Sequence, residues 1–432
     1  MAPSFAFGPG HEKPGGIVRV QVQSTPQTLA GADLDLPYEA ESHTALTVST
    51  ARGATELDAL ESDWRSLFDR SGTRNYFASY DWCKSWWDAL GSKSGTQPVV
   101  IGVRRGKELL ALLPLVVRRA GLVRSASSMA AETGQYGDIL LAPGLAPVEH
   151  IFRLLWDGIV GSGIDVIDFK KVRTDSPLFA FLAPRRRILG SEVFTHRLDT
   201  SKYENFEAYW KSRSASMRKN LRRARRKLEG VGKVTYEVIR DPDLLPAAFR
   251  QVIEHKHDWL RARGLRSDFL MKPEIFDWMS DVALKALQSG NLHLSVVRVD
   301  GQIISSQCAF ICKDRFTAYM STFDLDYSVY AAGKIQYQSF FEDVFDQGLT
   351  IDLMPYHEHF KRDWVDLGVA TYSCTVPVSR LGRLISTVAN PRNRDLIKGL
   401  YWRLPEGIRN FIATPRSYQI LRKRKDASDA QD

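Results

Sequence analysis

Side chains that could do acid–base chemistry gather in the C-terminal half of the chain. Carboxylates occur at Asp324, Asp326, Asp352 and Glu358, and the HEH sequence at residues 357–359 adds two histidines. Such groups are the usual general bases of enzymes that move a proton from a reacting group. Asp352 lies inside the apolar run LTIDLM, where burial would raise its pKa toward a useful value. A buried aspartate that caps a neighbouring loop is an equally simple interpretation.

A second chemical feature is the sequence Ala331-Ala332-Gly333-Lys334, which opens a helix directly after a strand. Backbone N–H groups without helical partners and the positive end of the helix dipole make such a start suited to an anion. Gly333 would allow a close approach of the backbone to a ligand, and Lys334 adds a positive charge. An ordinary glycine-containing helix start is the alternative.

Metal binding is not expected from the histidines. The chain has His-x-His pairs at residues 255–257 and 357–359. The first pair falls on a helix, where two positions are about 200° apart and cannot share one ion. The second pair has no third ligand at a recognisable spacing. The four cysteines show no paired pattern, which indicates a reducing, cytoplasmic compartment.

The elements that must position these residues occur in the same order twice along the chain. Each copy shows the apolar pattern of two helices, a hairpin, a third strand, a helix and a buried strand. The segments are residues 56–70, 80–90, 99–103, 109–117, 137–141, 148–160 and 163–169 in the first copy, and 243–263, 273–290, 292–299, 302–312, 316–323, 334–348 and 349–354 in the second. The hairpin signal Asp300-Gly301 has a counterpart at Gly106. We therefore predict an internal duplication of two α/β domains.

The net charge of +9 is concentrated in two segments. Residues 211–229 hold nine basic residues and one acid, and residues 380–425 hold twelve basic residues and two acids. The remainder has 38 basic and 47 acidic residues, so the body of the protein is acidic. Apolar residues interleaved with the basic ones of the tail suit an anionic membrane surface. No apolar run approaches the roughly 20 residues of a membrane span, so we expect at most peripheral attachment.

Together these patterns predict five regions. They are a disordered leader (1–45), an N-terminal domain (46–200), a basic linking helix (201–230), a C-terminal domain (231–378) and a basic amphipathic tail (379–432).

Several motifs in fixed order resemble a known family. They are FASYDW at residues 77–82, ALLPL at 111–115, YGD at 136–138, the arginine-rich segment ending in RRKLE, YSVYAAGKIQYQSF at 327–340 and DLMPYHEHFKRDW at 352–364. The chain resembles the CelD/BcsL-type acetyltransferases of the GNAT superfamily, which are related to the FemAB peptidyltransferases. The resemblance covers roughly residues 46–376. It implies two tandem GNAT-like domains, each with a mixed, mostly antiparallel sheet flanked by helices.

The resemblance also implies an activity and a site. It implies transfer of an acetyl or other acyl group from acyl-CoA to an amine or hydroxyl acceptor, near exopolysaccharide or cell-envelope assembly. Ser321, Thr322, Phe323, Ala332, Gly333 and Lys334 would contact the acyl-CoA, and Asp352, Glu358, Lys361 and Tyr356 would serve catalysis. Phe360 stands where relatives carry a tyrosine, so we expect Tyr356 to donate the proton to the leaving thiolate.

Two alternatives remain open for the function. One is a catalytically silent duplicated domain that acts as a scaffold at the membrane. The other is a FemAB-like transferase that uses charged tRNA, although the acidic body argues against a broad nucleic-acid surface. The expected acceptor is a small molecule, a saccharide or a lipid-linked compound.

Overall fold

The computed structural model describes residues 45–185, 187–265, 267, 269–355 and 359–389. The predicted leader and most of the predicted basic tail lie outside these residues. We call residues 45–200 the N-terminal half and residues 201–389 the C-terminal half.

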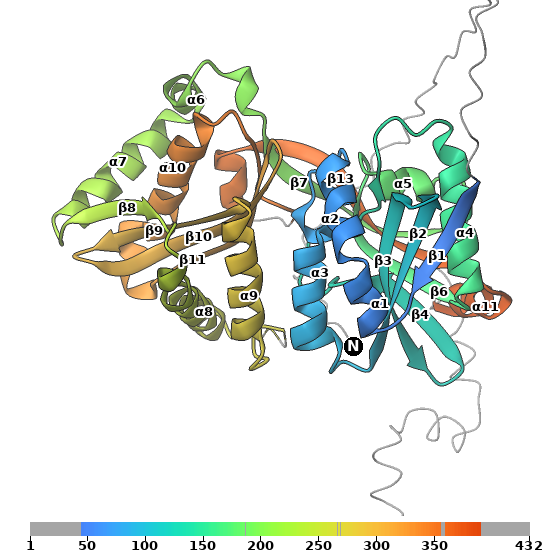
Figure 1. Cartoon of the computed structure of the whole chain (residues 1–432). Helices are drawn as coiled ribbons and strands as arrows, with labels where there is room; N and C mark the ends of the chain where they lie inside the picture. Colours follow the sequence, from blue (N-terminus) through green and yellow to red (C-terminus); the bar gives the residue numbers. More distant parts are fainter. Residues whose placement is uncertain (1–44, 186, 266, 268, 356–358, 390–432) are drawn as a thin grey trace, which may run out of the picture. The chain divides into compact units, whose positions relative to one another are not determined.

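Strands of both halves join in one hydrogen-bonded path (Figure 1). Its order is β1-β2-β3-β4-β6-β13-β7-β12-β11-β10-β9-β8, and β5 pairs with β3. The strands are β1 (Leu46–Ala51), β2 (Thr96–Arg105), β3 (Glu108–Ala120), β4 (Val123–Ser128), β5 (Leu140–Leu141), β6 (Val166–Arg173), β7 (Ile188–Leu198), β8 (Val234–Val238), β9 (Leu292–Val299), β10 (Gln302–Cys312), β11 (Arg315–Phe323), β12 (Thr350–Asp352) and β13 (Asp366–Pro377).

Each half contains one parallel pair of strands in an otherwise antiparallel arrangement. The parallel pairs are β4 with β6 and β11 with β12. The expected mixed, mostly antiparallel sheet is therefore confirmed. The halves are joined because β13, from the end of the C-terminal half, lies between β6 and β7, and because β7 pairs with β12. Residues 366–377, which the sequence predicted as the end of the C-terminal domain, thus pair with strands of the N-terminal half.

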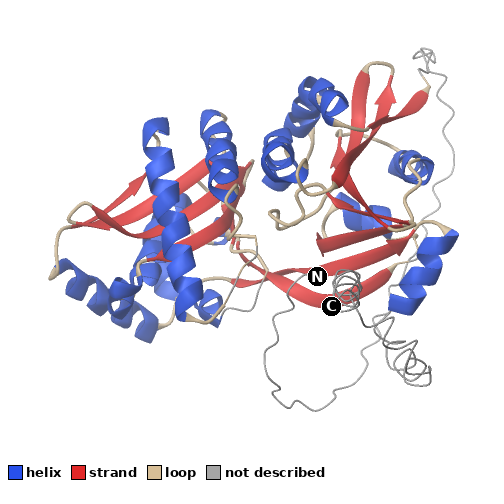
Figure 2. Ribbon diagram, turned by 90° about the horizontal axis from the view of Figure 1, so that it is seen from below, coloured by secondary structure: helices blue, strands red, loops and turns tan. Residues whose placement is uncertain are grey.

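Helices cover both sides of the sheet (Figure 2). They are α1 (Ala54–Ala59), α2 (Glu61–Arg70), α3 (Tyr80–Trp86), α4 (Val148–Gly161), α5 (Pro177–Leu182), α6 (Phe206–Ser212), α7 (Ala215–Glu229), α8 (Leu245–Ala262), α9 (Ile275–Gln288), α10 (Ala332–Phe345) and α11 (Arg380–Ala389). Short 3₁₀ turns connect several of them, among which Leu325–Tyr330 precedes α10. In the C-terminal half, α10 packs on one face of β9–β11, while α8 and α9 pack on the other (Figure 1).

Most predicted elements are present, and two helices differ from the expectation. Residues 56–70 form α1 and α2, which break at Leu60. The basic linking helix is divided as well, because Ser214 caps the N-terminus of α7 by accepting a hydrogen bond from the Met217 N–H. Trp210 therefore lies on α6, in the first of the two helices. The Asp300-Gly301 hairpin is confirmed, with positive φ at both residues (47° and 88°).

An aromatic cluster connects the two halves. The ring of Trp82, on α3, lies 5.1 Å from that of Trp278 on α9 and 5.1 Å from that of Phe310 on β10. Tyr76 stacks on Phe310 at 4.9 Å. Because such rings bury large apolar areas, this contact fixes the N-terminal half against the C-terminal sheet.

Candidate functional site

The end of β11 and the start of α10 form the first part of the candidate site. β11 pairs with β12 only from Arg315 to Thr317, whereas its pairing with β10 continues to Phe323. All three residues of β12 pair with β11, so among the described strands the part of β11 after Thr317 has no partner on this side, where β12 ends. The pairing with β10 skips Tyr319, which is a bulge in β11. A bulge re-aims the backbone of a strand and is common beside active sites.

The start of α10 has the features expected of an anion site. Ala331 has the left-handed conformation (φ 55°, ψ 40°) that directs the chain into the helix. The first turn of α10 contains no acidic residue, and Lys334 is exposed. A Cβ added at Gly333 would lie 3.1 Å from Cδ1 of Phe323, so this glycine permits close packing of the helix start on β11. Ala332 is buried beneath it.

A polar network extends from Ser321 into α10. The Ser321 hydroxyl donates to Oε1 of Gln307 and lies 3.4 Å from the hydroxyl of Tyr337. Tyr337 is buried, lies one helical turn after Gly333 and packs edge-to-face on the ring of Phe360 at 5.4 Å. No motif of the sequence singled out Tyr337. Its position four residues after Gly333 is the signal that could have identified it.

Asp352 lies at the seam between the two halves, which is the pairing of β12 with β7. It is fully buried, and its carboxylate accepts hydrogen bonds from the hydroxyl of Tyr136 (3.1 Å), Nη1 of Arg173 (2.7 Å) and the backbone N–H of Met354 (2.8 Å). Arg173 also forms two 2.9 Å hydrogen bonds to Asp175. Both oxygens of the Asp352 carboxylate already accept hydrogen bonds. The structure therefore favours the interpretation of Asp352 as a cap of the neighbouring loop over its interpretation as a general base.

The other predicted catalytic residues are distributed differently. Lys361 is buried in the turn His359–Asp363. Tyr356 and Glu358 lie outside the described residues, so their predicted roles stay predictions. Asp324 caps the turn before α10 by accepting a hydrogen bond from the Asp326 N–H. In the described part of the chain, no group of three or more His, Cys, Asp or Glu side chains could hold a metal ion.

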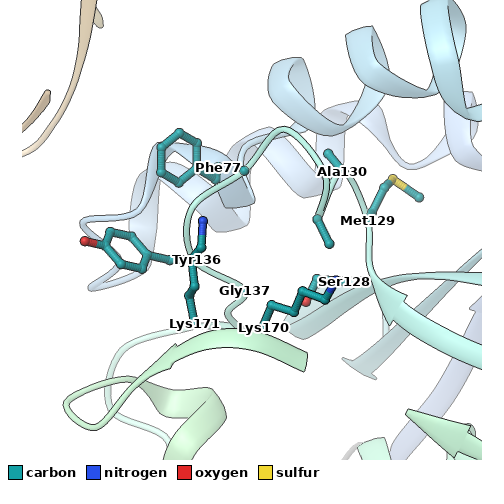
Figure 3. Close-up of a pocket in the computed structure, with 10 residues that line it drawn as sticks. Phe77, Ser128, Met129, Ala130, Tyr136, Gly137, Lys170 and Lys171 are labelled. Atoms are coloured by element: carbon teal, nitrogen blue, oxygen red, sulfur yellow. The ribbon is translucent and has the colours of Figure 1, made fainter. Parts of the chain in front are cut away.

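A small pocket lies in the N-terminal half (Figure 3). Its lining includes Phe77, Ser128, Tyr136, Lys170 and Lys171. Tyr136 lines this pocket and also donates a hydrogen bond to Asp352, so one residue contacts both the pocket and the seam. Burial lowers the pKa of the Lys171 ammonium to about 8, with smaller contributions from the charges of Lys170 and Lys361. No motif of the sequence singled out Lys170 or Lys171.

Part of the C-terminal half matches a known protein family. Residues 215–362 match the family model described as the acetyltransferase (GNAT) domain. This segment is a GNAT domain. The search of curated proteins returned no match.

Solved structures extend the likeness to the rest of the chain. FemX has a TM-score of 0.53 at 10% identity, over 75% of this chain and 98% of that chain. L-PGS from Bacillus licheniformis has a TM-score of 0.45 at 13% identity (78% and 97% covered), and a tandem GNAT protein from the clavulanic acid biosynthesis pathway has 0.42 at 10% identity (77% and 99% covered). At these identities the FemX likeness concerns the fold alone. The chain therefore has a fold like that of FemX, and within it residues 215–362 match the GNAT domain model.

Proposed function

We propose that this protein is an acyltransferase that moves an acyl group from acyl-CoA to an amine or hydroxyl acceptor. The observation that carries the proposal is the start of α10 in a GNAT domain, with Gly333 packed on Phe323, exposed Lys334 and no acidic residue in the first turn. The first N–H groups of a helix lack carbonyl partners one turn earlier and can bind a pyrophosphate. In α10 this applies to Ala332 and Gly333, because the Lys334 N–H already donates to the Ala331 carbonyl (2.9 Å). Acyl-CoA would supply the thioester.

Transfer requires the acceptor to lose a proton and the departing thiolate to gain one. We propose that a backbone N–H between Ser321 and Phe323 polarises the thioester carbonyl, since this part of β11 continues beyond its pairing with β12. Tyr337 is a second candidate for the proton donor beside Tyr356, because its hydroxyl lies near Ser321 and one turn from Gly333. Glu358 stays one of the candidate bases, and we assign Asp352 to positioning of the loop after β12 through its hydrogen bond to the Met354 N–H.

The cofactor proposal can be tested by ligand-induced stabilisation. A ligand at 100 times its Kd stabilises the folded state by about 2.7 kcal/mol, so acetyl-CoA should raise the melting temperature measurably. Gly333→Glu should abolish this shift, because a carboxylate at the helix start repels the pyrophosphate and its side chain meets Phe323. The matched control is Gly72→Glu, at an exposed glycine with open space around it. Absence of any shift with acyl-CoA in the unmodified protein would favour the scaffold alternative.

The proton-donor proposal needs a separate measurement. Tyr337→Phe removes one hydroxyl and should lower kcat by about 10²-fold or more, the range typical of a general acid, while acetyl-CoA binding is retained. Tyr330→Phe, in the turn before α10, is the control. Equal kcat for Tyr337→Phe and the unmodified enzyme would leave Tyr356 as the candidate.

We also propose that α7 brings the enzyme to an anionic membrane surface. Its exposed side chains include Lys219, Arg222, Arg223, Arg226 and Lys227, while Leu221 and Leu228 face the protein. Each Lys or Arg close to an anionic leaflet contributes about 1 kcal/mol. No helix in the described part of the chain has the length and apolar character needed to cross a bilayer.

Vesicle sedimentation can test this surface. Replacing Arg222, Arg223 and Arg226 by Gln should release the full chain from phosphatidylserine vesicles, whereas the same charge loss at Lys93, Lys107 and Arg119 should not. Removal of residues 390–432 measures the share of the predicted basic tail. Binding of tRNA that is lost in the α7 variant, with no vesicle binding, would instead favour the tRNA-dependent alternative.

A further inference from the structure

Three segments of the N-terminal half meet at Asp165. Its Oδ2 accepts a hydrogen bond from the Arg124 N–H in β4 (2.8 Å), and its Oδ1 accepts one from the hydroxyl of Ser379. The Asp165 carbonyl accepts two more, from the N–H groups of Val378 and Ser379 just before α11 (2.8 and 3.2 Å). The β3–β4 hairpin, the turn after α4 and the start of α11 therefore lie side by side.

α11 packs on this end of the half with its small residues and leaves its leucines outside. The helix contacts β6 and β13 (Figure 1). A Cβ added at Gly382 would overlap the Asp165 carbonyl, and Ser386, one turn later, is buried. Leu384 and Leu381, by contrast, are 63% and 37% exposed. Helices on the surface of a globular protein normally turn their leucines to the core, so this apolar side of α11 is available to a partner.

The hairpin and the turn after α4 add further exposed apolar side chains. Leu122, in the two-residue turn of the β3–β4 hairpin, is 83% exposed, and Val160 near the end of α4 is also exposed. A Cβ added at Gly163 would lie 3.8 Å from Nη1 of Arg124, so the hairpin reaches over the turn after α4. Exposed apolar groups that gather on one surface mark interaction sites.

The charge of this surface is positive. Residues 118–124 and 379–389 contain five arginines and no acidic residue. Four of these arginines are exposed, namely Arg118, Arg119, Arg380 and Arg383. The sequence that continues from α11, residues 390–425, adds ten basic and two acidic residues. Such a concentration of one sign favours an anionic partner.

We propose that Leu122, Leu381 and Leu384 insert into the surface of an anionic lipid bilayer, with the surrounding arginines bound to lipid headgroups. The leucines project from a tight turn and from the outer side of a helix, which suits a fluid acyl layer better than the shaped pocket of a protein partner. Arginines beside them reach the headgroup level while their stems stay against apolar surface. This surface is separate from α7 and rests on neither the α7 proposal nor the acyltransferase proposal.

Vesicle sedimentation of the full chain tests the apolar part of this surface. Leu122→Ser combined with Leu384→Ser should weaken binding to phosphatidylserine vesicles about tenfold or more, because each leucine loses the apolar area that it buries in the bilayer. Salt should weaken binding of the variant and of the unmodified protein without closing the gap between them, since it screens charges alone. The matched control replaces two other exposed leucines, Leu244→Ser with Leu367→Ser, and should bind as the unmodified protein does.

A fluorescent label can report the contact directly. The four native cysteines are buried, so a cysteine introduced by Leu384→Cys can be labelled alone with the environment-sensitive dye NBD. Its emission should rise and shift to the blue with phosphatidylserine vesicles, whereas a label at Leu244→Cys should not respond. A label at Leu384→Cys that is shielded without vesicles, and that becomes exposed when residues 390–432 are removed, would mean that this segment covers α11 and would overturn the proposal.

The outcomes also separate this surface from the other two proposals. Loss of vesicle binding in the α7 variant, with unchanged binding in the double leucine variant, would support α7 and overturn the present proposal. The control for α7 removes only one of the five arginines, Arg119, and so leaves this surface largely intact. The proposal is also overturned if the unmodified protein does not bind vesicles. Stabilisation by acetyl-CoA should be equal in all these variants, so the acyltransferase proposal stands or falls by its own measurement.

Discussion

The helix that precedes the last buried strand differs between the two halves. In the C-terminal half this helix is α10, with glycine and lysine in its first turn and no acidic residue there. In the N-terminal half it is α4, which follows Pro147 and carries Glu149 in its first turn. A carboxylate at this end of a helix occupies the position that an anionic ligand would need. Among the described helices, the start of α10 therefore fits the proposed pyrophosphate site better than the start of α4 does.

The connection before this helix differs as well. In the C-terminal half a single 3₁₀ turn, Leu325–Tyr330, leads from β11 to α10. In the N-terminal half residues 129–147 separate β4 from α4, and part of this longer segment forms the wall of the pocket that Lys170 and Lys171 line. The two halves therefore differ at the point where the C-terminal half carries the proposed acyl-CoA site.

The largest expected effect concerns the seam between the halves. Asp352→Ala leaves Arg173 and Tyr136 buried without this carboxylate, and breaking a buried ion pair on one side costs about 3–5 kcal/mol. Urea unfolding should show a loss of this size. Replacing both partners, as Asp352→Leu with Arg173→Met, should be less destabilising than Asp352→Ala. A stable Asp352→Ala protein without activity would mean that Asp352 acts in catalysis instead.

A second prediction concerns Asp138, a partly buried aspartate of the N-terminal half. Burial raises the pKa of Asp138 to about 7, and its Oδ1 accepts hydrogen bonds from the N–H groups of Ile139 and Leu178. The folded state thus binds this proton more tightly than the unfolded state, so its contribution to stability falls as pH rises from about 4 to 7. Asp138→Asn keeps the hydrogen-bond acceptor and should flatten stability in this pH window. An unchanged pH profile of the melting temperature would contradict the prediction.

A third prediction tests the difference between α10 and α4 directly. Lys334→Glu reverses a charge in the first turn of α10 and should weaken acetyl-CoA binding about five- to tenfold, since each charge at a helix terminus contributes about 0.3–1 kcal/mol. Glu149→Lys makes the opposite change in α4 and should leave the affinity unaltered. Calorimetric titration of acetyl-CoA into both variants measures the two affinities. An equal change in both would show that bulk charge controls the affinity.

The smallest effect is expected at the helix caps, which both halves share. Ser79 accepts a hydrogen bond from the Trp82 N–H at the start of α3, and Ser214 accepts one from the Met217 N–H at the start of α7. Removing such a cap costs about 1 kcal/mol. Ser79→Ala and Ser214→Ala should each lower the free energy of unfolding by this amount. A much larger loss for Ser214→Ala would indicate that α7 is essential to the C-terminal core.

Local patterns were enough to predict much of the fold. The hairpin at Asp300-Gly301 was predictable because a two-residue turn with positive φ needs these residue types. The helix after β11 and its start at Ala332 were predictable from apolar spacing and Gly333. The site residues at the end of β11 were taken from the family resemblance, and their contacts with the ligand remain a proposal.

The sequence by itself determined the duplicated order of elements and the hairpins, because these depend on neighbours within a few residues, and the GNAT domain was expected from the family resemblance. Tertiary structure alone decided the insertion of β13 between β6 and β7 and the contacts of Asp352 with Tyr136 and Arg173, which lie 216 and 179 residues away. It also decided a bulge in β6, which turns Lys170 and Lys171 into one pocket, since period-two alternation predicts opposite faces. Such pairings depend on which distant strand is adjacent, and no local periodicity encodes that choice.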